Sequence, residues 1–399
     1  MKHTPTKRRL GDITRFVSGG TPSKQVSHYW SGSTPWVSAK DLKSLHIDSS
    51  IDTLSDSGRD AASLVPRGTL LILVRGMTLF KSIPIGIASR ELAINQDLKG
   101  LITNGAVSPE FLAYSLLAKE NELLQMVEAA GHGTGRLGTD ALKDVLVRVP
   151  SLPEQHQVAS AIATWDTAIQ KTEQLIAAKE RHFAATSHML LASRKRLNGF
   201  SMKWGLRRAD EIFENTSRKG HLNEPLLSVT QERGVIPRGM LEGRVTMPSG
   251  ETGAFKLVEP GNFVISLRSF QGGLEHSNYR GLVSPAYTVL KEVVEIDERF
   301  FRHYFKSADF IKRLSVAVIG IRDGKQISFQ DFCSIKLPFP AVDEQKAIAA
   351  FLDKAEREIT LLRSYTEALK TQKRGLMQKL LTGQWRVPVS ALQSEHGNF

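Results

Sequence analysis

The chain has 399 residues, 41% of them hydrophobic, so it is long enough for two or three domains with real cores. Its formal net charge of +12 and pI near 9.7 favour a polyanionic partner, with nucleic acid the first candidate. The single cysteine, Cys333, excludes an internal disulfide framework and a multi-cysteine zinc site, which fits a reducing cytoplasm.

The N-terminus carries no recognisable export signal. Residues 1–9 are basic, but no apolar stretch of signal-peptide type follows them. No run of about 18 apolar residues occurs anywhere in the sequence. We therefore expect a cytoplasmic protein with no membrane partner.

The first hundred or so residues are typical of short strands separated by turns. Residues 10–17 are amphipathic and fit either a short strand or the entry to a helix, and a glycine-containing loop follows at 18–24. Residues 35–42 alternate in the manner of a half-buried strand. After a Pro-Arg-Gly turn at 66–68, the run 69–74 predicts a fully buried strand that ends at Arg75-Gly76.

The same order of elements then occurs twice. A predicted helix, a glycine-containing loop and a strand occupy 109–127, 131–136 and 145–149, and again 298–314, 320–326 and 334–337. Pro260-Gly261 and the strand-like run 262–267 likewise echo the earlier turn and buried strand. Each half is therefore expected to be a mixed α/β globule that leads into a long helix.

The long helix of the first half begins after Pro150. Ser151 and Glu154 have the spacing of a capping box, in which each side chain bonds the other residue's backbone N–H. Apolar or compatible residues follow in alternating steps of four and three, which predicts a coiled-coil seam: Val158, Ile162, Trp165, Ile169, Thr172, Ile176, Lys179, Phe183, Thr186 and Leu190. Asn198-Gly199 is predicted to end this helix.

A second seam lies 190 residues further on. It consists of Ile348, Leu352, Ala355, Ile359, Leu362, Thr366, Leu369, Lys373, Leu376 and Leu380, and Thr382-Gly383 is predicted to end that helix. The same offset relates Glu154-Gln155 to Glu344-Gln345 and Tyr114 to Tyr304. An internal duplication is the simplest interpretation.

Two similar seams on one chain favour a self-complementary contact related by a two-fold axis. The predicted fold is α+β: two mixed α/β globules separated by two long antiparallel helices that form an intramolecular coiled coil with pseudo-two-fold symmetry. The predicted domains are a first globule, a first helix, a second globule, a second helix and a polar tail, at 1–150, 151–198, 199–340, 341–384 and 385–399. Each helix would act as a spacer of about 50 Å.

The chain resembles the specificity (S) subunits of type I restriction-modification enzymes. The resemblance depends on the paired architecture, on Leu152-Pro153-Glu154-Gln155 and Val342-Asp343-Glu344-Gln345 at the helix starts, and on Leu380-Leu381-Thr382-Gly383 at the close. Gly19-Gly20-Thr21-Pro22, Pro35-Trp36-Val37 and Ala93-Ile94-Asn95-Gln96 add to it.

This resemblance implies a non-enzymatic reader of double-stranded DNA. Each target-recognition domain would bind one half of a bipartite asymmetric site, and the helices would set the spacing and dock modification (M) methyltransferase subunits. Restriction (R) subunits would join them. S-adenosylmethionine and ATP are expected on these partner subunits, and no cofactor is expected on this chain.

Base reading needs forked donors or paired donor and acceptor groups, which Arg, Asn and Gln provide. The candidates on predicted loops of the first globule are Lys24, Lys40, Arg75, Lys81, Asn95, Gln96 and Arg136. Those of the second globule are Arg238, Arg244, Arg268, Gln271, Arg322, Lys325 and Gln326. For each residue, a solvated surface group or a phosphate contact remains the simpler alternative to a base contact.

Catalytic and cofactor motifs are missing from the sequence. There is no Pro-Pro for an adenine methyltransferase motif, no Pro-Asp for a nuclease site, and no His-Glu-x-x-His or cysteine pair for a metal. Residues 133–138 fit G-x-G-x-x-G, but a helix rather than a strand is predicted before them, so the dinucleotide fold is not indicated. We expect no catalytic and no metal-binding residues.

Two alternatives of other classes stay open. One is a free-standing DNA-modifying enzyme whose active site matches none of these motifs. The other is a basic coiled-coil scaffold protein whose charge is incidental. Sequence-specific binding that survives raised salt would argue against the scaffold, because phosphate-only binding weakens steeply with ionic strength.

Overall fold

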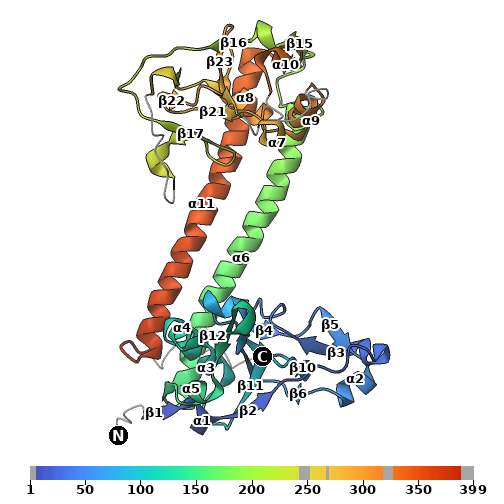
Figure 1. The fold of residues 1–399 in the computed structure, drawn as a ribbon, viewed down its shortest axis with the longest axis vertical. Helices are drawn as coiled ribbons and strands as arrows, with labels where there is room; N and C mark the ends of the chain where they lie inside the picture. Colours follow the sequence, from blue (N-terminus) through green and yellow to red (C-terminus); the bar gives the residue numbers. More distant parts are fainter. Residues whose placement is uncertain (1–5, 242–251, 267–268, 318–326, 388–399) are drawn as a thin grey trace, which may run out of the picture. The chain divides into compact units, whose positions relative to one another are not determined.

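The computed structural model describes residues 6–241, 252–266, 269–317 and 327–387. Backbone contacts divide the chain into two compact units, Met1–Thr172 with Tyr365–Phe399 and Glu173–Ser364. Each unit therefore contains one globule and part of each long helix (Figure 1).

The first globule is built from four small sheets. A two-stranded sheet pairs β1 (Thr6–Arg9) antiparallel with β14 (Leu146–Val149). A five-stranded sheet has the order β2 (Thr14–Ser18), β11 (Leu98–Thr103), β7 (Leu70–Leu73), β9 (Ile85–Ala88) and β4 (His46–Ile47). A four-stranded sheet has the order β5 (Asp52–Leu54), β3 (Trp30–Val37), β10 (Leu92–Ile94) and β6 (Leu64–Val65). A three-stranded sheet contains β12 (Val127–Ala130), β13 (Thr134–Leu137) and β8 (Arg75–Gly76).

Short helices complete this globule. They are α1 (Leu10–Ile13), α2 (Asp56–Asp60), α3 (Pro109–Ala118), α4 (Glu120–Gln125) and α5 (Thr139–Lys143), with the 3-10 helices η1 (Ser27–Tyr29), η2 (Met77–Phe80) and η3 (Gly131–Gly133). Strand β7 is fully buried, which confirms the prediction for this run. The core also takes in Val158 and Ile162 of the first long helix and Leu380 of the second. The helix segments of this unit are thus part of the globule's core.

The second globule has a different set of sheets. Strand β15 (Gly205–Arg208) pairs with β24 (Lys336–Phe339), just as β1 pairs with β14. A four-stranded sheet has the order β16 (Phe213–Thr216), β23 (Thr288–Glu292), β20 (Phe263–Ile265) and β21 (Glu275–His276). Two antiparallel pairs join β17 (Leu227–Thr230) to β18 (Gly234–Pro237) and β19 (Lys256–Val258) to β22 (Gly281–Val283). The helices are η4 (Ala209–Glu211), η5 (Arg238–Met240), η6 (Thr252–Ala254), α7 (Ser269–Gly272), α8 (Glu298–Tyr304), α9 (Ala308–Ala317) and α10 (Phe329–Cys333).

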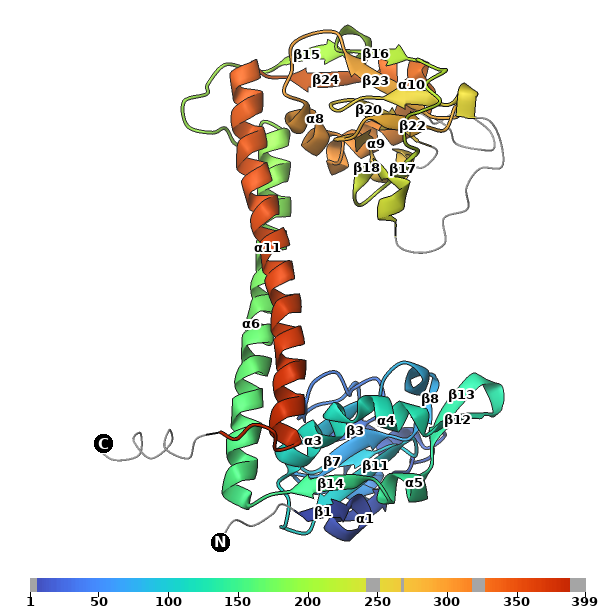
Figure 2. The same cartoon turned by 90° about the vertical axis from the view of Figure 1, so that its left-hand side faces the viewer.

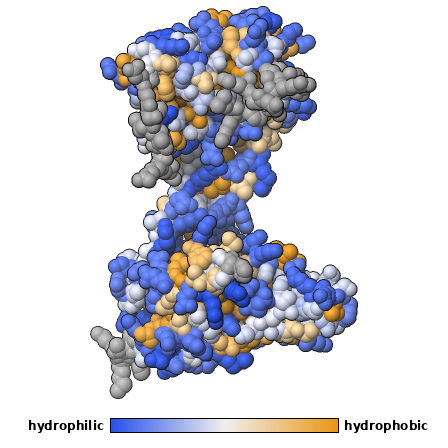
Figure 3. Space-filling model, viewed as in Figure 1, coloured by the Kyte–Doolittle hydropathy of each residue, from blue (hydrophilic) through white to orange (hydrophobic). Residues whose placement is uncertain are grey.

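Phenylalanines dominate the core of the second globule. Phe213 packs edge to face on Phe263 and Phe301, with ring centroids 5.7 Å and 5.3 Å away, the geometry that aromatic quadrupoles favour. Leu190 of the first long helix and Ile348 of the second belong to the same core. Figure 3 shows mostly hydrophilic residues over the visible face of each unit, with scattered hydrophobic ones.

The long helices are α6 (Leu152–Leu191) and α11 (Val342–Leu381), each of 40 residues, and their ends are 190 positions apart as the duplication predicts. Within each unit the two helix segments run antiparallel (Figure 2). Every residue proposed for the seam is buried or half-buried. The fold class predicted from the sequence, two mixed α/β globules with two long antiparallel helices, is confirmed.

Among the helices of the described ranges, none combines the length and apolar character needed to cross a bilayer.

A buried glutamine lies in the first turn of each long helix. The Gln155 side-chain amide donates to the carbonyl oxygens of Pro150 and Ala106, and its oxygen accepts from the N–H of Ser108, at 2.8–3.0 Å. Gln345 repeats this arrangement, donating to Pro340 and accepting from the N–H of Asp297, both at 2.9 Å. These bonds join each helix start to the residue that caps α3 or α8.

The predicted capping box of the first long helix is wrong. Within the described residues Ser151 and Glu154 make no reciprocal cap, because the Glu154 carboxylate accepts from the guanidinium of Arg148 at 2.6 Å. The backbone oxygen of Ser151 instead accepts from the N–H of Gln155.

Three predicted element boundaries and the predicted burial of one strand also differ. Helix α6 ends at Leu191 instead of near Asn198-Gly199, because Ser193 adopts a left-handed φ of 55°, the role that Gly383 has after α11 with φ 77°. The helix predicted over 109–127 is broken at Lys119 into α3 and α4, and the one over 298–314 into α8 and α9. The C-terminal part of β3, Thr34–Val37, is fully rather than half buried.

Candidate nucleic-acid interface

The loop at residues 18–24 is fixed against the four-stranded sheet of the first globule. The indole N–H of Trp36 donates to the carbonyl oxygen of Gly20 at 3.0 Å, and the N–H of Gly20 donates to Ile94 at 2.9 Å. A Cβ at Gly19 would lie 1.8 Å from the carbonyl oxygen of Asn95, so only glycine permits this close approach.

This loop brings two candidate DNA-binding residues together. Lys24 is exposed, and its Nζ lies 5.8 Å from the ring centroids of both Trp30 and Trp36, which pack edge to face. The Thr21 hydroxyl donates to the side-chain oxygen of Gln96, which is also exposed. Lys24 is thus presented beside two indole rings, and Gln96 is bonded to the same loop; a lysine and an amide of this kind are suited to contact with nucleic acid.

A second group forms around the three-stranded sheet. Arg75 of β8, Arg136 of β13 and Lys81, directly after η2, are all exposed. Arg136 was expected on a glycine loop, but it lies on a strand, because β12 and β13 form a hairpin around η3. The sheet pairs Arg136 directly with Arg75.

The remaining described candidates are less suited or stand alone. Asn95 is buried and its amide bonds Asp97, so it is not available to a ligand. Arg238 is half-buried on η5. Lys40, on a turn, and Gln271, on α7, are exposed. The candidates Arg244, Arg268, Arg322, Lys325 and Gln326 lie outside the described residues.

The sequence-based selection missed two exposed apolar residues in η2. Met77 is 73% and Phe80 51% exposed, and they lie between Arg75 and Lys81 in the chain. Apolar and aromatic side chains between basic residues are a usual signal for contact with nucleic acid, so this sequence pattern could have identified them.

The second unit holds a cavity of about 510 Å³ between α8, β21 and the long-helix segments of that unit. Glu275 and His276 line it. Burial raises the pKa of the Glu275 carboxyl against the opposing effect of Lys306, and burial lowers the pKa of His276 to about 4. Neither ring nitrogen of His276 has a partner among the described residues.

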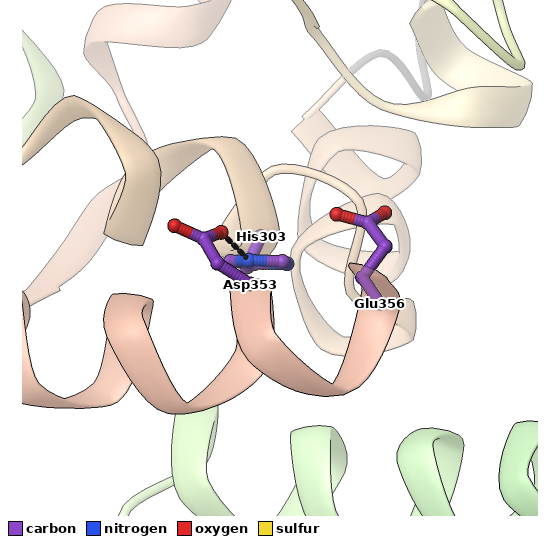
Figure 4. A group of neighbouring side chains, drawn as sticks. All are labelled: His303, Asp353 and Glu356. Carbon is purple, nitrogen blue, oxygen red and sulfur yellow. Dashed lines mark hydrogen bonds and ion pairs between the residues drawn. The ribbon is translucent and has the colours of Figure 1, made fainter. Parts of the chain in front are cut away.

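Next to this cavity, His303 of α8 faces Asp353 and Glu356 of α11 (Figure 4). The geometry permits a metal ion, but Arg302 already places its Nη2 2.8 Å from Asp353 and 2.7 Å from Glu356. Burial raises the pKa of the Asp353 carboxyl, but hydrogen bonds from His303 and Arg302 outweigh it, so the pKa lies below its usual value. The group is therefore an ion-pair network in which Arg302 supplies the positive charge.

A sequence profile described as the type I restriction modification DNA specificity domain matches residues 4–180 and 261–371. The specificity subunit of the type I restriction enzyme EcoR124I/EcoR124II from Escherichia coli is 26% identical over 163 residues, 40% of each chain. The MjaIX specificity subunit from Methanocaldococcus jannaschii is 28% identical over 42% of this chain and 39% of the relative. The chain thus matches about two fifths of the length of these two relatives. The MjaVIII specificity subunit, from the same organism as MjaIX, is 22% identical over 95% of this chain and 92% of the relative.

Solved structures share the fold at low sequence identity. The S subunit of a type I restriction-modification system from M. genitalium superposes with a TM-score of 0.56 and 15% identity, over 96% of this chain and 97% of that one. The HsdS subunit from Thermoanaerobacter tengcongensis gives 0.51 and 16%, over 96% and 98%. A chain from a study of complex assembly and conformational transition in a type I R-M system gives 0.61 and 16%, over 95% and 98%.

Proposed function

Since the chain belongs to the type I restriction modification DNA specificity family, we propose that it is the DNA-recognition subunit of a type I restriction-modification complex and catalyses no reaction itself. The observation that carries this proposal is the extent of the family match. It covers parts of both copies of the duplication, from the first globule into α6 and from the second globule into α11. A net charge of +12 supports double-stranded DNA as the ligand.

Each globule would read one half of a bipartite, asymmetric DNA site. In both globules the first strand pairs antiparallel with the strand that precedes the long helix, β1 with β14 and β15 with β24. Their other sheets differ in strand number and order, so the surfaces they offer to DNA differ. Two unlike surfaces on a common frame favour two different half-sites.

The partners would be the modification and restriction subunits, in the cytoplasm where the DNA is. The modification subunits would dock on the long helices and bring S-adenosylmethionine for adenine methylation, and the restriction subunits would use ATP. Ala161, Ala168, Leu175 and Met189 follow one stripe of α6, and Leu175 and Met189 are exposed. This stripe is a candidate docking surface.

Genome-wide mapping of adenine methylation, with and without this gene, tests the proposal. We expect one bipartite motif with two unlike halves to disappear on deletion and to return on complementation. An unchanged methylation pattern in a strain that expresses the modification subunit would contradict the proposal.

The helices would also act as a ruler. Inserting one heptad into α6 and one into α11 at matching places preserves the seam and adds about 10 Å to each helix. The gap between the half-sites should therefore lengthen by about three base pairs, at roughly 3.4 Å each. An unchanged gap in an active complex would contradict the ruler.

A further inference from the structure

The three-stranded sheet of the first globule places a row of charged side chains across its strands. In the register of this sheet, Arg136 of β13 lies directly opposite Arg75 of β8 on one side and Glu128 of β12 on the other. Directly opposed residues of an antiparallel pair project from the same face, with Cβ atoms about 4.5–5.5 Å apart. Two arginines therefore stand side by side on an exposed face.

The arginines are not neutralised within the protein. Among the described residues, no carboxylate lies within ion-pair distance of either guanidinium, and Glu128 does not pair with Arg136 although it lies opposite. Like charges directly opposed in a sheet are destabilising. This contrasts with Arg59 of the same globule, which bonds Glu91 at 2.6 Å. The repulsion between Arg75 and Arg136 would be relieved by an anion bound between them.

Two glycines fix the backbone under this row. Gly135 is paired with Gly76, and a Cβ at Gly135 would lie 2.8 Å from Val127 Cγ1 and 3.0 Å from Leu79 Cβ. Gly76 has a φ of 148°, which favours glycine. Strand β13 is thus packed tightly against its neighbours, so the register of the sheet, rather than a loose loop, sets the spacing of the two arginines.

We propose that Arg75 and Arg136 together hold one phosphate of the DNA backbone, and that this edge of the first globule is a DNA-contacting surface (Figure 2). This inference rests on the proposed function. A phosphate fits the pair because its oxygens can accept hydrogen bonds from two guanidinium groups at once. The major-groove edge of guanine offers only two acceptors, and a single arginine satisfies both. Lys81 and the exposed Met77 and Phe80 flank the pair and extend this surface toward neighbouring sugars and phosphates.

The test measures DNA binding by the full chain in complex with its modification subunits. The variants are Arg75→Ala, Arg136→Ala and the double variant. Arg67→Ala is the control for the loss of one charge, because Arg67 is an exposed arginine of the same globule that belongs to none of the three strands. The probes are the bipartite site found by methylation mapping and the same duplex with both halves scrambled. Each is titrated over a series of salt concentrations.

A phosphate contact predicts equal losses on the two duplexes. Each single variant should lower affinity for both by roughly threefold to tenfold, and the slope of log K against log salt should become shallower by about one. The double variant should also lose only about one unit of slope, because both arginines serve the same phosphate. Arg67→Ala should change affinity less than either variant.

Four outcomes would overturn the inference. The first is unchanged DNA binding by the double variant, and the second is a loss of affinity for the specific duplex alone. The third is a salt slope that falls by about two units in the double variant, and the fourth is normal DNA binding with failed assembly of the modification subunits. The second outcome would make the pair a base reader, and the last would make it a protein contact. The single variants should melt at or above the wild-type temperature, since a repulsion is removed, which separates lost binding from lost folding. If the unaltered complex shows no preference for the specific duplex, the proposed function itself fails.

Discussion

The starts of α6 and α11 hold their glutamates differently. In the first unit, Glu154 is 28% exposed and pairs with Arg148 of the adjoining strand β14. In the second unit, Glu344 is 2% exposed, accepts from Nε and Nη2 of Arg196 at 2.5 Å each, and accepts from the indole N–H of Trp204 at 2.9 Å. Arg196 and Trp204 belong to the segment that follows the end of α6.

This difference separates what the duplication kept from what it changed. The glutamine next in sequence makes two matching backbone bonds in both units, to the proline just before the helix and from the residue that caps α3 or α8, so the join between globule and helix is common. The two glutamates have different partners. Arg386 is the counterpart of Arg196, 190 positions later, but it is exposed. In the first unit Arg148 therefore pairs with Glu154 instead. The frame is shared, and the segments that pack around it are specific to each unit.

The largest expected effect comes from removing the arginine at each junction. Arg196→Ala leaves Glu344 buried with only the Trp204 indole, which should lower the free energy of unfolding by about 3–5 kcal/mol. Arg148→Ala leaves the more exposed Glu154, which water can solvate, so about 1–2 kcal/mol is expected. Urea unfolding measures both. Adding Glu344→Gln to Arg196→Ala should restore part of the loss, and equal losses for the two single variants would contradict this comparison.

Replacement of the shared glutamines should instead affect both units alike. Gln155→Leu and Gln345→Leu each leave buried backbone groups without partners, and about 2–4 kcal/mol is expected for each. Gln170→Leu, at an exposed position of α6, is the matched control and should cost little. A large loss for only one of the two glutamines would show that the junctions are not equivalent.

Acid should weaken the second unit before the first. The pKa of His276 in the folded state, about 4, lies below its ordinary value of 6.5, so the unfolded chain binds the proton first. The contribution of His276 to the stability of this unit is therefore intact above pH 6.5 and should decrease by about 2–3 kcal/mol as the pH falls toward 4. Burial also lowers the pKa of His303, which adds in the same direction.

His276→Leu tests this pH dependence. The variant should reduce the dependence of unfolding free energy on pH by about one proton between pH 6.5 and 4. In the described part of the first unit, His28, His46 and His156 are exposed. A slope that is unchanged in the variant would exclude His276 as the cause.

The smallest predicted effect concerns two tyrosines at equivalent positions. The Tyr114 hydroxyl donates to Asp166 at 2.8 Å, whereas the buried Tyr304 hydroxyl has no partner among the described residues. Tyr114→Phe should therefore cost about 1 kcal/mol, and Tyr304→Phe should be neutral or slightly stabilising. Thermal unfolding of the two variants measures this difference, and the reverse order would contradict the assigned bonds.

The repeated parts of the fold could be predicted because a duplication records them twice. The heptad seams, the start of each long helix and the buried run 69–74 all depend on local pattern, and they lie where the sequence placed them. Ser193 escaped prediction because a serine takes the left-handed position that glycine takes after α11. A sequence rule that looks for glycine at a helix end finds Gly383 and misses a serine in the same backbone conformation.

The candidate interface was harder to predict because it depends on contacts between distant segments. Arg75 and Arg136 were both selected from the sequence, but their pairing follows from a strand register that local pattern does not encode. Asn95 was selected for its amide, although its burial beneath the loop at 18–24 assigns it to structure. The cavity beside Glu275 and His276 likewise arises only when β21 packs beside α8.

The central claim is that the two globules read DNA independently on a common frame. It is tested most directly by replacing residues 205–339, from β15 to β24, with residues 6–149, from β1 to β14, and mapping adenine methylation in cells that carry the modification subunit. The account predicts a bipartite motif in which the half assigned to the second globule is replaced by the sequence of the other half. Retention of the original two unlike halves by an active complex would contradict it.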